Sequence, residues 1–183
     1  MELIGPYLAA CLLLVVAGLS KSVRPLDTAR AVSAVIPLPL TAARTLVRVG
    51  AAAEVVIGAV GAIHPSPVAA VLVAASYLVF ASFVVVARAR GGSLATCGCF
   101  GTPDTPATRL HVVVNLGLAG SAAVVAATVP AAWLTTLLSA QPWHGVPLVG
   151  LSVLCAWMVF LALTRLAELG AARRRLGLTR ERG

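Results

Sequence analysis

The sequence is poor in charged and aromatic residues. Of its 183 residues, 11% are charged, 5% are aromatic and 60% are hydrophobic, and the mean hydropathy is +0.98. Soluble domains carry about 25% charged residues, so this composition excludes an ordinary soluble enzyme. It also excludes a disordered chain, which needs low hydrophobicity. Four cysteines are too few for a small fold that is held together by disulfides.

Acidic residues are scarcer than basic ones. Six Asp and Glu stand against 14 Lys and Arg, which gives a net charge of +8. Such an excess can indicate nucleic-acid binding, but here the basic residues lie at the ends of apolar runs, as they do in membrane proteins. We therefore expect membrane lipid, and no nucleic acid, as the main partner.

Five apolar runs are long enough to cross a bilayer, which takes about 17–25 residues per helix. The turn His64-Pro65-Ser66-Pro67 separates the second run from the third, because two prolines cannot continue a helix. The sequence therefore predicts an all-α polytopic membrane bundle over residues 1–170, followed by a basic cytoplasmic tail over 171–183. The predicted spans are about 3–20, 49–63, 68–87, 111–130 and 146–163.

The basic residues also predict the orientation. All 14 Lys and Arg fall in segments 21–48 and 88–110 or near the C-terminal end, which five spans place on one side of the membrane. The positive-inside rule then predicts an N-terminus outside and a C-terminus in the cytoplasm. Within the first of these segments, Asp27–Ile36 has the pattern of a short amphipathic helix that lies along the membrane interface.

The motif Cys97-Gly98-Cys99-Phe100-Gly101 lies in the second basic segment. A disulfide between two cysteines one residue apart departs from the usual geometry, and Gly98 relaxes the limits on the backbone between them. A strained disulfide is easily reduced, which favours thiol exchange. Two alternatives stay open: the cysteines pack in a tight turn, or they form half of a metal site with His111 as the only spare ligand nearby.

Three polar residues could join these cysteines. Glu54 lies inside the second predicted span, where acids are costly and commonly functional; it either pairs with a loop arginine or handles a proton. His111 and Asn115 open the fourth span with the i, i+4 spacing that puts them on one helix face, although Asn115 could equally bond a neighbouring helix. The order of the spans brings all of them to one side of the membrane. Cys11 and Cys155 lie in mid-span and are expected to pack as small apolar residues.

The order of these features resembles a known family. The first span ends in Gly18-Leu19-Ser20-Lys21, the second contains Glu54-Val55-Val56-Ile57-Gly58, and the Cys-Gly-Cys-Phe-Gly motif precedes a span that opens with an Asn. This pattern resembles the methylamine-utilisation MauE family, which is related to the DoxX-like membrane proteins. The resemblance covers about residues 3–130 and implies a four-helix core to which a fifth C-terminal span has been added.

The resemblance implies a redox-associated protein of the bacterial plasma membrane. Members are linked to maturation of the disulfide-rich small subunit of methylamine dehydrogenase, together with a thioredoxin-like partner. It implies that Cys97 and Cys99 are the redox pair and that Glu54 acts beside them. The supporting residues would be His111, Asn115, Phe100, Gly98 and Gly101. No cofactor is evident, and a membrane quinone is a candidate electron acceptor by analogy with other membrane thiol oxidants.

Three hypotheses about function follow. The first is a thiol–disulfide oxidoreductase that assists disulfide formation in a partner protein. The second is a non-catalytic membrane scaffold subunit whose cysteines stay reduced, and the third is a small metal-binding membrane protein. The charge distribution puts the cysteines on the cytoplasmic side, where thiols are kept reduced. The direction of electron flow is therefore open.

Overall fold

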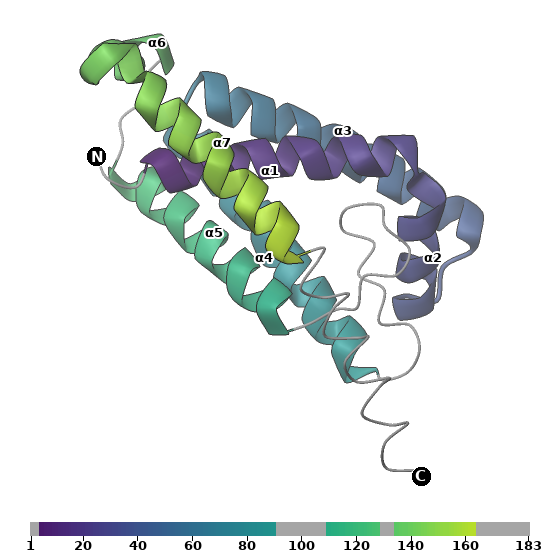
Figure 1. Cartoon of the computed structure of the whole chain (residues 1–183). Helices are drawn as coiled ribbons and strands as arrows, with labels where there is room; N and C mark the ends of the chain where they lie inside the picture. Colours follow the sequence, from purple (N-terminus) through teal and green to yellow (C-terminus); the bar gives the residue numbers. More distant parts are fainter. Residues whose placement is uncertain (1–3, 91–108, 129–133, 164–183) are drawn as a thin grey trace.

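The computed structural model describes residues 4–90, 109–128 and 134–163, and these contain helices and no strand (Figure 1). The long helices are α1 (Ile4–Val23), α3 (Leu40–Ile63), α4 (Pro67–Ala89), α5 (Arg109–Thr128) and α7 (Val146–Leu161). The shorter ones are α2 (Pro25–Val35), α6 (Leu134–Ser139) and the 3₁₀ turn η1 (Pro142–Gly145). Within these described ranges, five helical segments are long and apolar enough to cross a membrane; the last one runs from Trp143 to Leu161. The predicted fold class, an all-helical polytopic membrane bundle, is confirmed.

The helix that contains the second predicted span starts well before that span. α3 begins at Leu40 rather than at residue 49, and Arg44 and Arg48 are exposed on its first turns. Long arginine side chains can keep their charge in water while the helix beneath them continues, so a basic residue does not mark the helix start. With 24 residues, α3 is about 36 Å long at 1.5 Å per residue.

The predicted amphipathic helix is present as α2, which begins with Pro25 in the first turn. Proline suits that position because its missing N–H has no helical partner there. Ala29 of α2 is buried against Ala43 and Val47 of α3. The far end of α2 is tied to α4, because the Arg90 guanidinium donates a hydrogen bond to the carbonyl oxygen of Val35.

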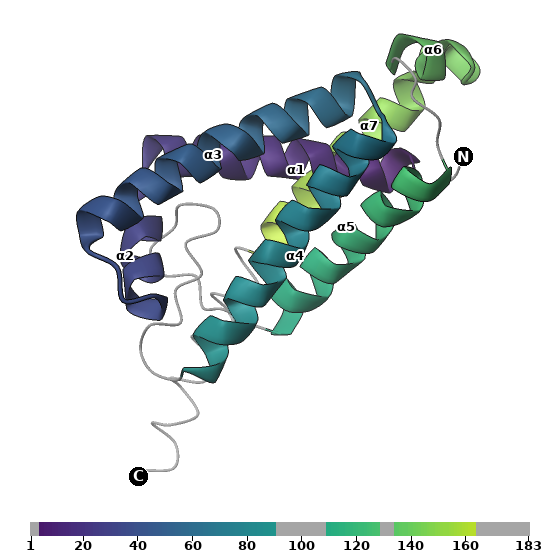
Figure 2. The same cartoon turned by 180° about the vertical axis from the view of Figure 1, so that it is seen from behind.

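Two antiparallel helix pairs form the body of the bundle. α1 lies along α3, and α4 lies along α5, while α7 crosses α1 on the outside (Figures 1 and 2). The two pairs are close together near the turn between α3 and α4 and diverge toward α2 (Figure 2). The end of the bundle where the pairs diverge is also where α4 ends and α5 begins.

The main core joins α1, α4 and α5 and consists largely of small residues. Its buried members are Tyr7, Ala10, Cys11, Leu14, Ala70, Val73, Ala74, Tyr77, Ala119, Ala122 and Val125. Small side chains let membrane helices approach closely, which is how they gain packing energy in lipid. The Tyr77 hydroxyl crosses this core and donates to the carbonyl oxygen of Ala10 at 2.6 Å.

Glycines set the close approach of α1 to α3. A Cβ atom on Gly18 would lie 2.7 Å from the carbonyl oxygen of Ala51, and one on Gly58 would lie 2.7 Å from that of Cys11. Only a residue without a side chain fits at either position. Because Gly18 lies one turn before Lys21, the same contact brings the end of α1 against the middle of α3.

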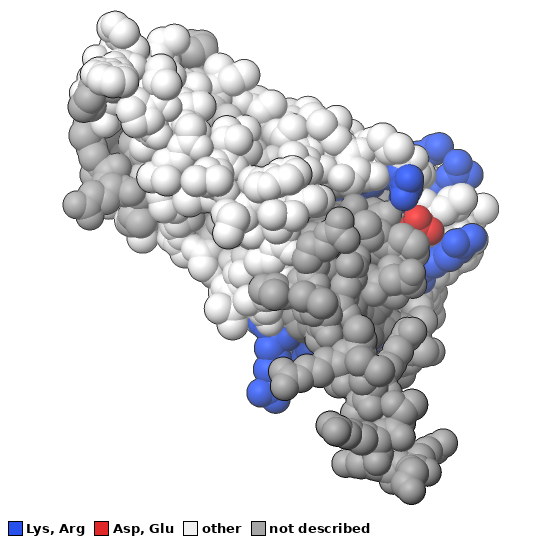
Figure 3. Space-filling model, viewed as in Figure 1, with Lys and Arg blue, Asp and Glu red and all other residues white. Residues whose placement is uncertain are grey.

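The described basic residues gather at the diverging end of the bundle. They are Lys21, Arg24, Arg30, Arg44, Arg48, Arg88, Arg90 and Arg109. The surface in Figure 3 is white over most of the helical body, and the blue side chains lie at the end that contains α2 and the end of α4. The opposite end of the bundle contains the turn between α3 and α4 and helix α6 (Figure 1), and it carries no Lys or Arg within the described part of the chain.

Candidate functional site

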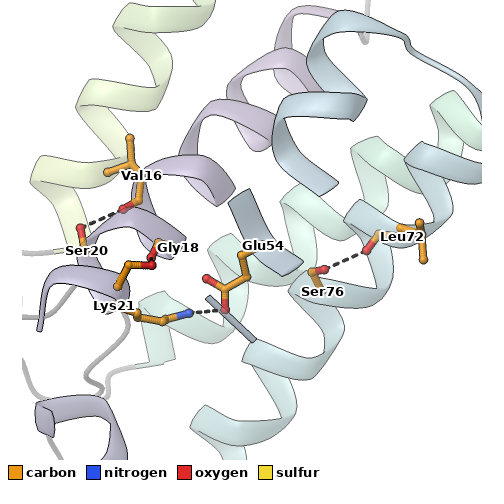
Figure 4. Close-up of polar contacts among 8 residues, drawn as sticks. Val16, Gly18, Ser20, Lys21, Glu54, Leu72 and Ser76 are labelled. Carbon is orange, nitrogen blue, oxygen red and sulfur yellow. Dashed lines mark hydrogen bonds and ion pairs between the residues drawn. The ribbon is translucent and has the colours of Figure 1, made fainter. Parts of the chain in front are cut away.

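An ion pair between α1 and α3 is the central polar feature of the described helices. The ammonium Nζ of Lys21 lies 2.5 Å from Oε1 of Glu54 (Figure 4). Only 7% of the Lys21 side chain and 11% of the Glu54 side chain are exposed. A pair this buried must offset the cost of removing two charges from water, so it requires close contact. The glycine contact at Gly18 supplies that closeness.

The aromatic ring of Phe80 on α4 completes the surroundings of the pair. Lys21 Nζ lies 4.3 Å from the centroid of this ring, which is within the range of a cation–π interaction. Phe80 is held edge-on by Tyr77, with ring centroids 5.9 Å apart and planes at 88°. The second carboxylate oxygen of Glu54, Oε2, is buried and has no hydrogen-bond partner among the described residues.

A second polar pair lies on α5. His111 is 1% exposed and Asn115 is 7% exposed, and the Asn115 side-chain amide donates to the backbone carbonyl of His111 at 2.7 Å. Both residues line a small cavity of about 20 Å³, together with Leu13, Ala17, Tyr77, Phe80, Leu118 and Leu163. A space of this size can hold about one water molecule, and polar walls favour one.

Phe80 lines both the cavity beside His111 and a larger pocket beside Glu54. The two polar pairs therefore share one aromatic wall, with α5 contributing one pair and the α1–α3 contact the other. This arrangement brings the predicted residues Glu54, His111 and Asn115 to the same region of the bundle. It also puts them toward the end of the bundle where the α4–α5 pair diverges from the α1–α3 pair.

The remaining predicted site residues, Cys97, Gly98, Cys99, Phe100 and Gly101, lie outside the described residues. They belong to the segment that connects Arg90, just after α4, to Arg109, the first residue of α5.

The two mid-span cysteines differ in their surroundings. Cys11 is buried in the main core, as expected for a small packing residue, while Cys155 on α7 is exposed.

Two residues of the site were missed in the sequence. The partner of Glu54 is Lys21, not an arginine of a loop, whereas the sequence pattern predicts Lys21 only as the end of the first span. The signal was present, since Lys21 and Glu54 are the basic and acidic residues nearest the apolar interior at the same end of consecutive spans. Phe80 carried no signal, because nothing along α4 distinguishes an aromatic residue in the core from one between two polar pairs.

The fold and this site define a class: a polytopic helical membrane protein with a buried ion pair at its basic end. A family model described as "Methylamine utilisation protein MauE" matches residues 2–128. The chain belongs to the MauE family, as the motifs suggested, and the match ends at the last residue of α5. No curated protein and no solved structure matches this chain.

Proposed function

We propose that this member of the MauE family is a thiol–disulfide exchange protein that assists disulfide formation in a partner protein. Cys97 and Cys99 would be the exchanging pair. The observation that carries the proposal is the gathering of buried polar groups, Lys21 with Glu54 and His111 with Asn115, at one end of the bundle. The Cys-Gly-Cys segment connects the two helix termini at that same end.

The exchange needs no reactant beyond the two proteins. A thiolate of the partner attacks one sulfur of the Cys97–Cys99 disulfide, so that this S–S bond breaks and a mixed disulfide forms. The second partner thiolate then attacks the mixed disulfide, which closes the partner disulfide and releases Cys97 and Cys99 as two thiols. Two electrons pass from the partner to the Cys97–Cys99 pair. The ring strain expected for a Cys-x-Cys disulfide favours this direction.

Proton transfer accompanies each step, because the attacking group is a thiolate, whereas the partner thiols before the reaction and the Cys97 and Cys99 thiols after it carry a proton. Glu54 and His111 are the groups in the described site that can exchange a proton near neutral pH when suitably placed. Asn115 would support the site as a neighbouring polar group on the same helix face, where its amide donates to the backbone carbonyl of His111. In this proposal Glu54 would take part in the exchange as well as in the packing of α1 against α3.

The partner would be a thioredoxin-like or disulfide-containing protein, and the site would lie in the bacterial plasma membrane. The gathering of the described basic residues at one end of the bundle supports a cytoplasmic position for that end under the positive-inside rule. The N-terminus would then face outward and the cysteine segment would leave from the cytoplasmic end.

Differential alkylation tests the redox state of the pair. Free thiols in membranes are blocked with a light maleimide after acid quenching, disulfides are reduced, and the new thiols are labelled with a heavy maleimide. We expect the peptide with Cys97 and Cys99 to carry the heavy label and Cys155, the internal control, to carry the light one. A light label on all three would contradict a resting disulfide and favour a scaffold subunit.

A functional arm uses matched serine variants. We expect the Cys97→Ser/Cys99→Ser protein to lose oxidation of a reduced thioredoxin-like substrate, while Cys155→Ser retains it. Equal rates in the two variants would refute the proposal. Repeating the alkylation with a membrane-impermeant maleimide in intact cells then shows from which face the pair is reached.

A further inference from the structure

Helix α7 lies outside the part of the chain that the family model matches, which ends at residue 128. A smaller share of it is buried than of the other four candidate spans. Between Val146 and Leu161, Ser152 is the one residue that is buried. Spanning helices associate through close packing, so the few contacts that α7 does make are informative about its role.

The two ends of α7 approach the bundle differently. Near its start, α7 touches α1: a Cβ atom on Gly5 would lie 3.5 Å from Cδ1 of Leu148 and 3.7 Å from Oγ of Ser152. Two residues past its last turn the chain is buried again, since Leu163 is 4% exposed. That leucine lines the small cavity beside His111.

Leu163 completes the wall of this cavity. The other lining residues all belong to the part of the chain that the family model matches; they are Leu13, Ala17, Tyr77, Phe80, His111, Asn115 and Leu118. The cavity measures about 20 Å³, which is room for about one water molecule. With Leu163 in place, neither a lipid tail nor a small lipophilic molecule fits beside His111.

A second, apolar pocket of about 260 Å³ separates the later turns of α7 from α1. Its walls are Leu12, Leu13 and Val16 of α1 and Val153, Ala156, Trp157 and Phe160 of α7. A void removes the dispersion contacts that close packing supplies, so the second half of α7 is held less tightly than the first. Leu13 lines this pocket and the cavity beside His111 alike. The loosely packed stretch therefore lies next to the wall that Leu163 closes.

We propose that α7 is a movable lateral cover that controls access to the polar site. In the closed position, Leu163 shuts His111 and Asn115 off from the lipid. When the second half of α7 moves away from α1, small lipophilic molecules reach His111 from the bilayer. All of these residues belong to the described helices and their ends, so the cover does not require the thiol exchange proposed above.

Modification of His111 by diethyl pyrocarbonate tests the cover. This reagent partitions into bilayers and acylates neutral imidazole, but it is too large for the closed cavity. The full-length protein is treated in phosphatidylcholine nanodiscs, and mass spectrometry follows His111 and the exposed His144, the internal reference. We expect Leu163→Ala to raise the relative rate at His111 at least about tenfold, because loss of a buried leucine side chain favours the open position. The matched control Leu154→Ala, which changes an exposed leucine of α7, should react at the parent rate.

Three further measurements separate access from stability. Leu163→Met nearly keeps the volume of the side chain and should react like the parent. Ala156→Leu fills part of the pocket between α1 and α7, so it should hold the second half of α7 in place and slow modification of His111 by about threefold or more. In Leu163→Ala, maleimide labelling of Cys11 in the main core should stay at the parent rate, because the rest of the bundle remains closed.

Several outcomes would overturn the proposal. One is equal modification of His111 in Leu163→Ala and Leu154→Ala. Another is faster labelling of Cys11 in Leu163→Ala by the same factor as His111, because the whole bundle would then be opening. A rate in Ala156→Leu at or above the parent rate would refute the movement of α7. The Cys97→Ser/Cys99→Ser protein should react like the parent, so a failure of the thiol exchange leaves this test unaffected.

Discussion

Replacing Glu54 with Gln removes one charge of a buried pair and leaves the other, the Lys21 ammonium, in an apolar region. At the observed separation of 2.5 Å and an effective dielectric constant of about 20, the attraction between the two charges is about 7 kcal/mol. Desolvation of both groups offsets much of this, so the intact pair adds little net stability. Breaking it is different, because the remaining charge stays desolvated, and we expect a loss of about 3–5 kcal/mol.

The thiol of Cys11 provides the assay. Cys11 is 0% exposed and lies in the main core on α1, so it reacts with a maleimide only when the bundle opens. With the other three cysteines replaced by Ser, its labelling rate under native conditions reports the population of the open state. A loss of 3 kcal/mol corresponds to labelling about 100-fold faster, at 1.4 kcal/mol for each factor of ten.

The double variant Lys21→Met/Glu54→Leu is the control for this prediction. Since it leaves no buried charge, its labelling rate should lie within about tenfold of the parent rate. The reasoning is refuted if Glu54→Gln labels as slowly as the parent, or if the double variant labels as fast as Glu54→Gln.

Three further predictions concern packing and topology. Gly58→Ala should destabilise the bundle by about 1–3 kcal/mol, because its new methyl group would lie 2.7 Å from the backbone oxygen of Cys11. The control Gly117→Ala should leave the stability unchanged, because nothing lies within 4 Å of its new methyl group. Equal melting temperatures of the two variants would contradict the close contact between α1 and α3. Tyr77→Phe should cost about 1 kcal/mol in the same melt through loss of its interhelical hydrogen bond, and an unchanged melting temperature would argue against that bond. In the Cys-free background, Arg30→Cys and Ser139→Cys should react with impermeant maleimide from opposite membrane faces, the latter from outside; labelling from one face would disprove the five-span arrangement.

Much of the fold could be predicted because a bilayer imposes simple rules on a sequence. Each span must be helical and apolar, so five apolar runs predicted five helices. Pro65 and Pro67 located the turn between α3 and α4. The start of α3 was not predictable in the same way. Arg44 and Arg48 interrupt the apolar run without ending the helix, because their charged ends reach past it.

The candidate site, too, could be predicted from the sequence only in part. A lone acid inside an apolar run identified Glu54, and helical spacing put His111 and Asn115 on one face of α5, since both signals are local to one helix. The partner of Glu54 depends instead on how two helices cross. Lys21 reaches it only because Gly18 and Gly58 bring α1 against α3, and Phe80 lies between the two polar pairs only because α4 packs beside α1 and α5.

The sequence alone therefore determined the class of protein, the number of spans, the distribution of charge and the residues that are unusual in lipid. The tertiary structure decided which of those residues meet, and it formed the pocket beside Glu54. The physical reason is that burial in lipid acts on each segment separately, whereas ion pairs and pockets arise from contacts between helices that are distant in the chain.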